Sequence, residues 1–155
     1  IVLRVCNQTE RYARTRLAVI DTGGLSGPLP VFVSPIEIEQ ALLNIVRNAT
    51  ESASRSVHVE VSTRRDGNDA LVTIRDDGAG MEESEVEHAF DPFFTTRLGR
   101  GGTGLGLSVA HGVVADHGGT LSIESHRGVG TAVHIRLPLH GNDDEEEAAS
   151  DDRSR

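Results

Sequence analysis

The feature that most constrains this chain is its glycine-rich stretch Gly101-Gly102-Thr103-Gly104-Leu105-Gly106-Leu107, which runs directly into helix-compatible residues. Glycine lacks a Cβ, so successive backbone N–H groups can converge on an anion, and the N-terminus of a following helix favours negative charge. The stretch therefore predicts a site for a phosphorylated ligand.

Three phosphate-binding arrangements compete for this stretch. A Walker-type loop needs Lys and then Ser or Thr after its last glycine, but position 107 is Leu and the chain contains no lysine. Gly99, Gly101 and Gly104 spell GxGxxG, yet a dinucleotide-binding fingerprint leaves a strand, and residues 91–97 do not resemble one. The third arrangement, a glycine hinge that closes a mobile lid over ATP, is supported by residues elsewhere in the chain.

The clearest helix begins at Ser34, with Pro35 at the first helical position and Glu37 placed to complete a capping box. Its buried face is marked by residues that recur at helical spacing, Ile38, Leu42, Ile45 and Ala49. On the same helix Asn44, Asn48 and Glu51 form one adjacent row. Spacing alone leaves two interpretations of this row, a polar helix edge or a set of ligand- or metal-binding groups.

Two stretches of alternating polarity predict antiparallel hairpins with one buried face. The hairpins comprise 57–61 with 71–75 and 120–124 with 132–137. The other expected elements are a helix at 7–16, a strand at 17–20, a loop at 21–30, a short strand at 31–33, an acidic helix at 82–89 and a helix at 104–118. Residues 90–102 form a long segment with little periodic structure, which inside a compact domain favours a functional lid. We expect the last helix to be amphipathic, with Leu105, Val109 and Val113 on one face.

The second strand of the first hairpin runs into Asp76-Asp77-Gly78-Ala79-Gly80-Met81. Glycines at 78 and 80 allow a tight turn and the close approach of a flat ligand. A carboxylate held there can accept a hydrogen bond from an exocyclic amine, although an ordinary Asp-Gly turn has the same sequence.

These elements predict an α+β fold, a two-layer sandwich in which about three helices cover one face of a mixed, mostly antiparallel sheet. The expected units are an N-terminal leading edge at 1–30, a main folded domain at 31–140 and an acidic, disordered tail at 141–155. The formal charge of -9 argues against a nucleic-acid partner. The single cysteine, Cys6, excludes an internal disulfide. Without a long apolar run or a signal peptide, we expect a cytoplasmic location and no direct membrane contact.

Four ordered motifs carry a family resemblance. They are residues 40–49 (QALLNIVRNA), 76–81 (DDGAGM), 90–97 (FDPFFTTR) and 102–107 (GTGLGL). They resemble the N, first glycine, F and second glycine boxes of the ATP-binding catalytic domain of sensor histidine kinases, which has the Bergerat fold of the GHKL superfamily. The resemblance covers roughly residues 31–138. Separately, the chain starts abruptly at Ile1 with no cap or targeting signal before it, so we expect it to be part of a longer protein.

The resemblance implies ATP and Mg²⁺ as cofactors. Asn48 matches the metal ligand, Asp76 the acceptor for the adenine amine, and Thr131 the supporting hydroxyl. Arg97 is placed to reach the terminal phosphate. The implied nucleotide-binding set is Asn48, Glu51, Asp76, Gly78, Gly80, Met81, Thr96, Arg97, Gly102, Thr103, Gly104, Leu105, Gly106 and Thr131.

Position 44 bears on the type of reaction. The family's ATPases carry a glutamate there, whereas Asn44 cannot take up a proton, so Asn44, Asn48 and Arg97 are the implied catalytic residues of a kinase with slow hydrolysis. Glu51 departs from the Lys or Arg of many relatives.

The implied partners are a histidine-bearing dimerisation domain, in cis upstream or in trans, and a response regulator receiver domain. A stand-alone ATPase and a non-catalytic nucleotide-binding domain are the alternatives.

Overall fold

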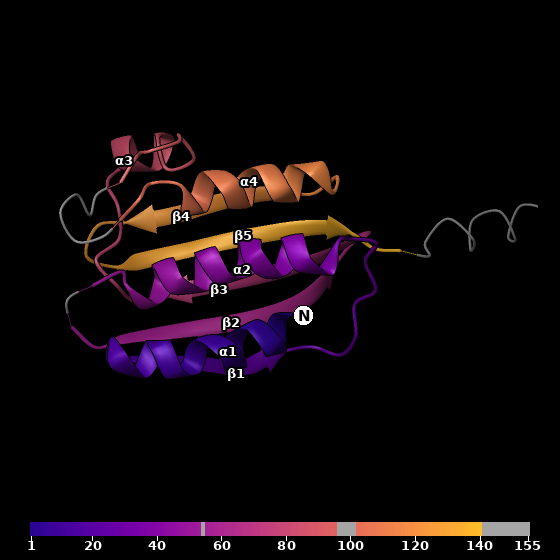
Figure 1. Ribbon diagram of the computed structural model, residues 1–155, viewed down its shortest axis with the longest axis horizontal. Coiled ribbons are helices and arrows are strands. Elements are labelled where there is room, and N and C mark those ends of the chain that lie inside the picture. The colour runs from indigo at the N-terminus through magenta and orange to yellow at the C-terminus, as the bar shows by residue number, and fades with distance from the viewer. Residues whose placement is uncertain (54, 96–101, 141–155) are drawn as a thin grey trace, which may run out of the picture.

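Five strands form one open sheet in the order β1-β2-β3-β5-β4 (Figure 1). In this computed structural model, residues 1–53, 55–95 and 102–140 are described. The strands are β1 (Ala18–Leu25), β2 (Val57–Asp66), β3 (Asp69–Asp76), β4 (Thr120–His126) and β5 (Gly130–Pro138). β1 pairs with β2 in parallel and every other pairing is antiparallel, so both predicted hairpins are confirmed.

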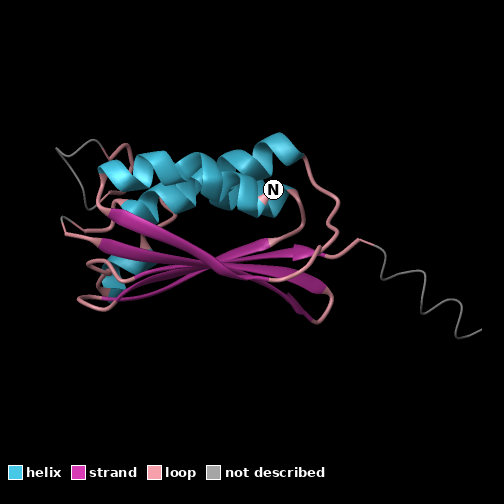
Figure 2. Cartoon of the chain, turned by 90° about the horizontal axis from the view of Figure 1, so that it is seen from below, coloured by secondary structure: helices cyan, strands magenta, loops and turns pink. Residues whose placement is uncertain are grey.

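Three helices cover one face of the sheet, as Figure 2 shows. They are α1 (Val2–Thr15), α2 (Pro35–Thr50) and α4 (Gly106–Asp116), and the short α3 (Glu83–Glu87) lies beside β4 at one end. The predicted α+β two-layer architecture is therefore confirmed. Within the described ranges, none of the helices is both long and apolar enough to cross a membrane.

The core lies between the sheet and the three helices. Along β2 the buried residues Val57, Val59 and Val61 alternate with exposed His58 and Glu60, as expected for a strand with one buried face. The predicted stripe of α2, Ile38, Leu42, Ile45 and Ala49, is buried opposite them. This packing fixes α2 over the centre of the sheet, next to the end of β3.

α2 begins where the sequence predicts, but its first turn is capped differently. Ser34 is the N-cap residue, yet its side chain makes no capping hydrogen bond. The backbone N–H of Ser34 instead donates to Nε2 of His117, at 3.0 Å, and the other ring nitrogen lies 2.7 Å from the carbonyl oxygen of Val113. The expected capping box is therefore wrong, and a histidine at the end of α4 joins that helix to the start of α2.

The N-terminal region is more regular than predicted. α1 starts at Val2 rather than at residue 7, and β1 continues to Leu25 through the expected loop. Gly24 lies inside this strand, where an added Cβ would come within 2.7 Å of the Ser62 Cβ, so glycine serves close strand packing there. Residues 31–33, predicted as a strand, contribute only an isolated bridge between Val31 and Leu139.

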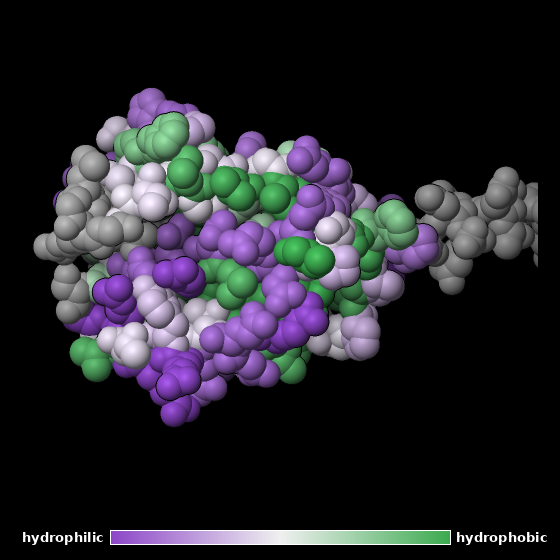
Figure 3. Space-filling view, in the orientation of Figure 1, coloured by the Kyte–Doolittle hydropathy of each residue, from purple (hydrophilic) through white to green (hydrophobic). Residues whose placement is uncertain are grey.

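The buried face of α4 also differs from the prediction. Ala110 and Val114 are buried, whereas Leu105 and Val109 are 38% and 45% exposed. Val113 is partly buried and packs against the core. Figure 3 shows the resulting apolar strip along α4. α4 packs closely against α2, and close helix packing favours a small residue such as Ala110 at the contact.

Candidate nucleotide-binding site

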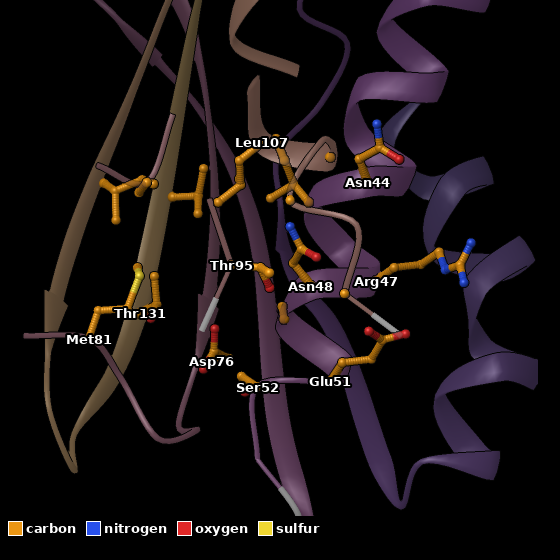
Figure 4. Close-up of a pocket in the computed structure, with 18 of the residues that line it drawn as sticks. Asn44, Arg47, Asn48, Glu51, Ser52, Asp76, Met81, Thr95, Leu107 and Thr131 are labelled. Atoms are coloured by element: carbon orange, nitrogen blue, oxygen red, sulfur yellow. The ribbon is translucent and has the colours of Figure 1, made fainter. Parts of the chain in front are cut away.

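A cavity of about 350 Å³ opens between α2, the end of β3, the start of β5 and the start of α4. Figure 4 shows Asp76 and Thr131 on the sheet side and Asn44 and Asn48 on α2. The other residues on its wall that the sequence had singled out are Glu51, Gly80, Met81, Gly102, Thr103, Gly104 and Gly106. Side chains from the predicted N box and both glycine boxes thus meet in one place.

Asp76 is the last residue of β3 and is only 6% exposed. Its Oδ1 accepts a hydrogen bond of 2.9 Å from the backbone N–H of Gly78, so the turn after the strand fixes the carboxylate. A Cβ on Gly78 would lie 2.6 Å from this oxygen and 1.9 Å from the Ser52 hydroxyl. Glycine is therefore required at 78 to let the carboxylate and the hydroxyl approach each other.

Burial raises the pKa of Asp76 above its ordinary value of 3.8, because the charged form loses hydration. The neighbouring Ser52 hydroxyl and the Gly78 N–H oppose this rise. Ser52 Oγ is buried, and among the described residues no partner forms a hydrogen bond of standard geometry with it. A buried hydroxyl of this kind beside a carboxylate leaves hydrogen-bonding capacity for a ligand or a water molecule.

Ser125 supports the sheet side of the cavity, and the sequence had not singled it out. Its hydroxyl accepts a 2.8 Å hydrogen bond from the Met81 N–H and lies 2.9 Å from the Thr131 hydroxyl. Gly80 has a φ of +64°, and a Cβ there would lie 2.0 Å from the carbonyl oxygen of His126. The second part of the glycine turn is thereby held against the β4–β5 hairpin.

The N-terminus of α4 meets the polar row of α2. A Cβ on Gly106, the first residue of α4, would lie 3.6 Å from both Asn44 Cβ and Asn48 Nδ2. Both asparagines are half-buried and line the cavity, so the row faces the site rather than bulk solvent. The positive end of the α4 dipole is therefore directed at the same wall as the two amides, where it favours an anionic ligand.

Gly104 anchors one end of the glycine-rich stretch. It has a φ of +67°, and its carbonyl accepts a 2.9 Å hydrogen bond from the N–H of Phe93, which itself has a φ of +68°. An added Cβ would come within 2.4 Å of the Phe93 backbone. Phe93, inside the segment predicted as a lid, and Gly104, just after it, are thus held together by backbone contacts.

Four predicted residues have a different placement. Gly78 and Leu105 do not line the cavity: Gly78 lies behind Asp76, and Leu105 is exposed at the start of α4. Thr96 and Arg97 lie outside the described residues, as does the predicted acidic tail at 141–155. Arg47, which the sequence had not singled out, lines the cavity on the side nearest α1.

The donor set of the cavity suits a hard cation held largely by a ligand. The described residues contain no group of three or more His, Cys, Asp or Glu placed to bind a metal. The α2 wall offers the amide oxygens of Asn44 and Asn48 and the carboxylate of Glu51. Mg²⁺ prefers oxygen ligands and typically uses few protein groups together with waters and substrate phosphates, so the residues fit such an ion.

A second cavity of about 600 Å³ lies at the opposite end of the sheet. It is lined mainly by apolar residues around the start of α1, the loop before α2 and the end of β5. It offers few polar groups for binding or chemistry, so the smaller cavity at Asp76 is the candidate functional site.

Residues 33–141 match the family described as histidine kinase-, DNA gyrase B-, and HSP90-like ATPase. The chain belongs to this ATPase family. The match contains all four motifs and the whole wall of the cavity that the structure describes on α2, the two hairpins and α4. The predicted resemblance to sensor histidine kinases is thereby confirmed.

Relatives of this family member include sporulation kinase E of Bacillus subtilis, which is 34% identical over 75% of the chain and 16% of its own length. Sensor histidine kinase ZraS of Escherichia coli is 33% identical over 68% of the chain and 22% of its own length. The chain thus spans about a sixth to a quarter of the length of the curated relatives it matches.

Solved structures of histidine kinases share the fold. The mycobacterial sensor histidine kinase MprB superposes with a TM-score of 0.76 at 29% identity, covering 88% of this chain and 93% of that one. The catalytic domain of histidine kinase ThkA superposes with a TM-score of 0.75 at 27% identity, covering 89% and 90%. The chain therefore has the fold of a histidine kinase catalytic domain.

Proposed function

We propose that this domain binds Mg²⁺-ATP in the cavity at Asp76 and transfers the γ-phosphoryl group to a histidine on a separate dimerisation domain. The observation that carries the proposal is the buried Asp76 carboxylate, held by the Gly78 N–H in the cavity that both asparagines of α2 line. A carboxylate in this setting accepts a hydrogen bond from the amine of adenine and rejects guanine, which has a carbonyl there.

The phosphates would lie at the α2 side, near the N-terminus of α4. In this arrangement the side-chain oxygen of Asn48 would hold Mg²⁺, and the ion would supply neutralisation of the phosphate charge. Arg97 is proposed to reach the terminal phosphate, and Thr96 and the glycines at 102, 104 and 106 to complete the nucleotide site. Thr103 and Leu105 are proposed to line the nucleotide.

Phosphotransfer then depends on positioning and charge neutralisation. A ring nitrogen of the acceptor histidine attacks the γ-phosphorus, the bond from that phosphorus to the β–γ bridging oxygen breaks, and ADP leaves with the electron pair. A neutral imidazole is already a nucleophile near neutral pH and needs little help from a base. Asn44, which cannot remove a proton, is compatible with this acceptor and disfavours water.

The partners follow from this chemistry. The dimerisation domain supplies the histidine in cis or in trans, and the phosphoryl group passes on to a response regulator receiver domain in two-component signalling. The domain is proposed to work in the cytoplasm. Residues 31–140 form the catalytic unit in this proposal, and residues 1–30 form its leading edge, supported by the pairing of β1 with β2.

The test incubates the chain with γ-labelled ATP and Mg²⁺ and follows binding, phosphate release and labelling of the protein together. Binding without release or self-labelling is expected, and a purified dimerisation domain from the full-length kinase should then become labelled. Sustained phosphate release would instead identify an ATPase, and the absence of ATP binding would overturn the proposal.

A further inference from the structure

Three side chains from two helices meet at the edge of the cavity nearest α1. The Tyr12 hydroxyl of α1 donates a hydrogen bond to Glu51 Oε1 at the end of α2. The guanidinium carbon of Arg47, one turn earlier on α2, lies 4.8 Å from the Tyr12 ring centroid. Arg47 and Glu51 line the cavity, and Figure 4 shows them extending to the side away from Thr131 and Met81.

Arg47 has a particular electrostatic importance. Among the described residues that line the cavity, Arg47 is the one with a permanent positive charge, while Asp76 and Glu51, which also line it, are acidic. A triphosphate needs cationic partners, and an arginine fork matches phosphate oxygens better than any other side chain. Of the described wall residues, Arg47 is therefore the one suited to bind phosphate through charge.

The contact between Arg47 and Tyr12 is a cation–π contact. Such a contact is an electrostatic attraction between the guanidinium and the ring and needs none of the five N–H donors of the arginine. The ring restricts the long arginine side chain without occupying its donors. The entropy that a free arginine would lose on binding phosphate is thereby reduced.

The hydrogen bond from Tyr12 to Glu51 acts on the same arginine. Arg47 and Glu51 are four residues apart on α2, the spacing at which opposite charges pair on a helix. The tyrosine hydroxyl donates to Oε1 of this carboxylate. We therefore expect the carboxylate to pair less strongly with Arg47 and to neutralise less of its positive charge.

We propose that Arg47 binds the phosphates of ATP and that Tyr12 is the positioning residue that holds Arg47 and Glu51 in the arrangement required. This inference rests on the proposed function, since it takes the ligand to be a nucleoside triphosphate. It assigns α1, a helix outside the four sequence motifs, a part in nucleotide affinity.

The test measures the affinities of the whole chain for Mg²⁺-ATP and for AMP by calorimetry. Arg47→Gln should weaken ATP binding about tenfold, the loss expected for one charge-assisted hydrogen bond, and leave AMP binding within about twofold. The ATP affinity of Arg47→Lys should lie between those of the wild type and Arg47→Gln, because lysine keeps the positive charge but lacks the forked guanidinium.

Arg16→Gln is the matched control. Arg16 also lies over the Tyr12 ring, at 5.5 Å, but it is not on the cavity wall. Its substitution should leave ATP affinity unchanged.

A double-mutant cycle tests the coupling between Tyr12 and Arg47. Tyr12→Leu should weaken ATP binding about threefold in the wild-type background and not at all in the Arg47→Gln background.

Unchanged ATP affinity in Arg47→Gln would overturn the inference, and so would an equal loss of ATP and AMP binding, which indicates general damage to the site. Additive effects of the Tyr12 and Arg47 substitutions would overturn the positioning role of Tyr12. Failure of the folded wild-type chain to bind ATP at all would instead overturn the proposed function, so the two failures are distinguishable.

Discussion

Asp76 at the end of β3 and Thr131 near the start of β5 are direct partners in the antiparallel register. Cross-strand partners present their side chains on the same face, about 5 Å apart. Both side chains line the cavity, and Ser125 holds the hydroxyl of Thr131 from the next strand. The proposed adenine contact therefore depends on strands from both hairpins.

Asp76→Asn should weaken ATP binding by about tenfold to a hundredfold, because an amide replaces a charged acceptor in a buried site. Calorimetry with Mg²⁺-ATP measures the effect. Asp77→Asn is the matched control, since Asp77 is exposed and accepts a hydrogen bond from the His58 N–H outside the cavity. Equal affinities for the Asp76→Asn variant and the wild type would contradict the assignment.

The raised pKa of Asp76 predicts a pH dependence of binding. As the pH is lowered toward this pKa, the carboxylate takes up a proton at a higher pH than an exposed aspartate would, so affinity for adenine should fall. Adenosine is the suitable ligand because it carries no titrating phosphate. A wild-type affinity that stays constant down to the ordinary aspartate pKa would count against this prediction.

Stability should show the opposite trend. Between the ordinary value of 3.8 and the raised pKa, the native state keeps a proton on Asp76 that the unfolded chain releases. The contribution of this residue to the free energy of unfolding therefore decreases as the pH rises through that window. Urea unfolding of the wild type and of Asp76→Asn across acidic pH measures the free energy of unfolding of each. Parallel dependences of that free energy on pH in the two proteins would contradict the prediction.

Gly80→Ala should destabilise the fold by about 2 kcal/mol or more, because alanine is strained at positive φ and the added Cβ meets a backbone oxygen. Gly112→Ala offers a contrasting control within α4. An added Cβ there meets nothing within 4 Å, so about 0.5–1 kcal/mol of stabilisation is expected. Thermal unfolding compares the two, and similar melting temperatures would refute the role of Gly80.

Asn44→Glu should increase the release of phosphate from ATP, by about tenfold if the carboxylate reaches a water molecule near the γ-phosphate as a general base. Asn44→Gln has the same side-chain length without the base and should remain as slow as the wild type. A phosphate-release assay distinguishes them. Equal rates in both variants would show that position 44 does not control hydrolysis.

The sequence predicted the fold where local signals and packing agreed. The alternation of Val57, Val59 and Val61 fixed a strand and its buried face. α4 was predicted with the wrong face, because hydrophobicity favours large residues such as Val109 while close packing against α2 selects Ala110. Gly24 was taken as a loop signal, although a neighbouring strand is what requires its small size.

The candidate site follows the same distinction. Asp76 and Asn48 belong to short motifs whose chemistry can be recognised locally. Ser125 acquires its role only through the β4–β5 register, and Tyr12 only through the packing of α1 against α2. Exposed arginines on helices are usually solvated, so nothing in the sequence distinguished Arg47 from the others.

The strand order has a further consequence for how the protein folds and unfolds. β2 with β3 and β4 with β5 are local hairpins, whereas the β3–β5 pairing joins residues far apart in the chain. Because closing a long loop costs more entropy, we expect this pairing to form after the hairpins. Asp76 and Thr131 lie on opposite sides of that pairing. An adenine bound to both would act as a clamp between the two halves, so the nucleotide would retard their separation and protect the domain from proteolysis.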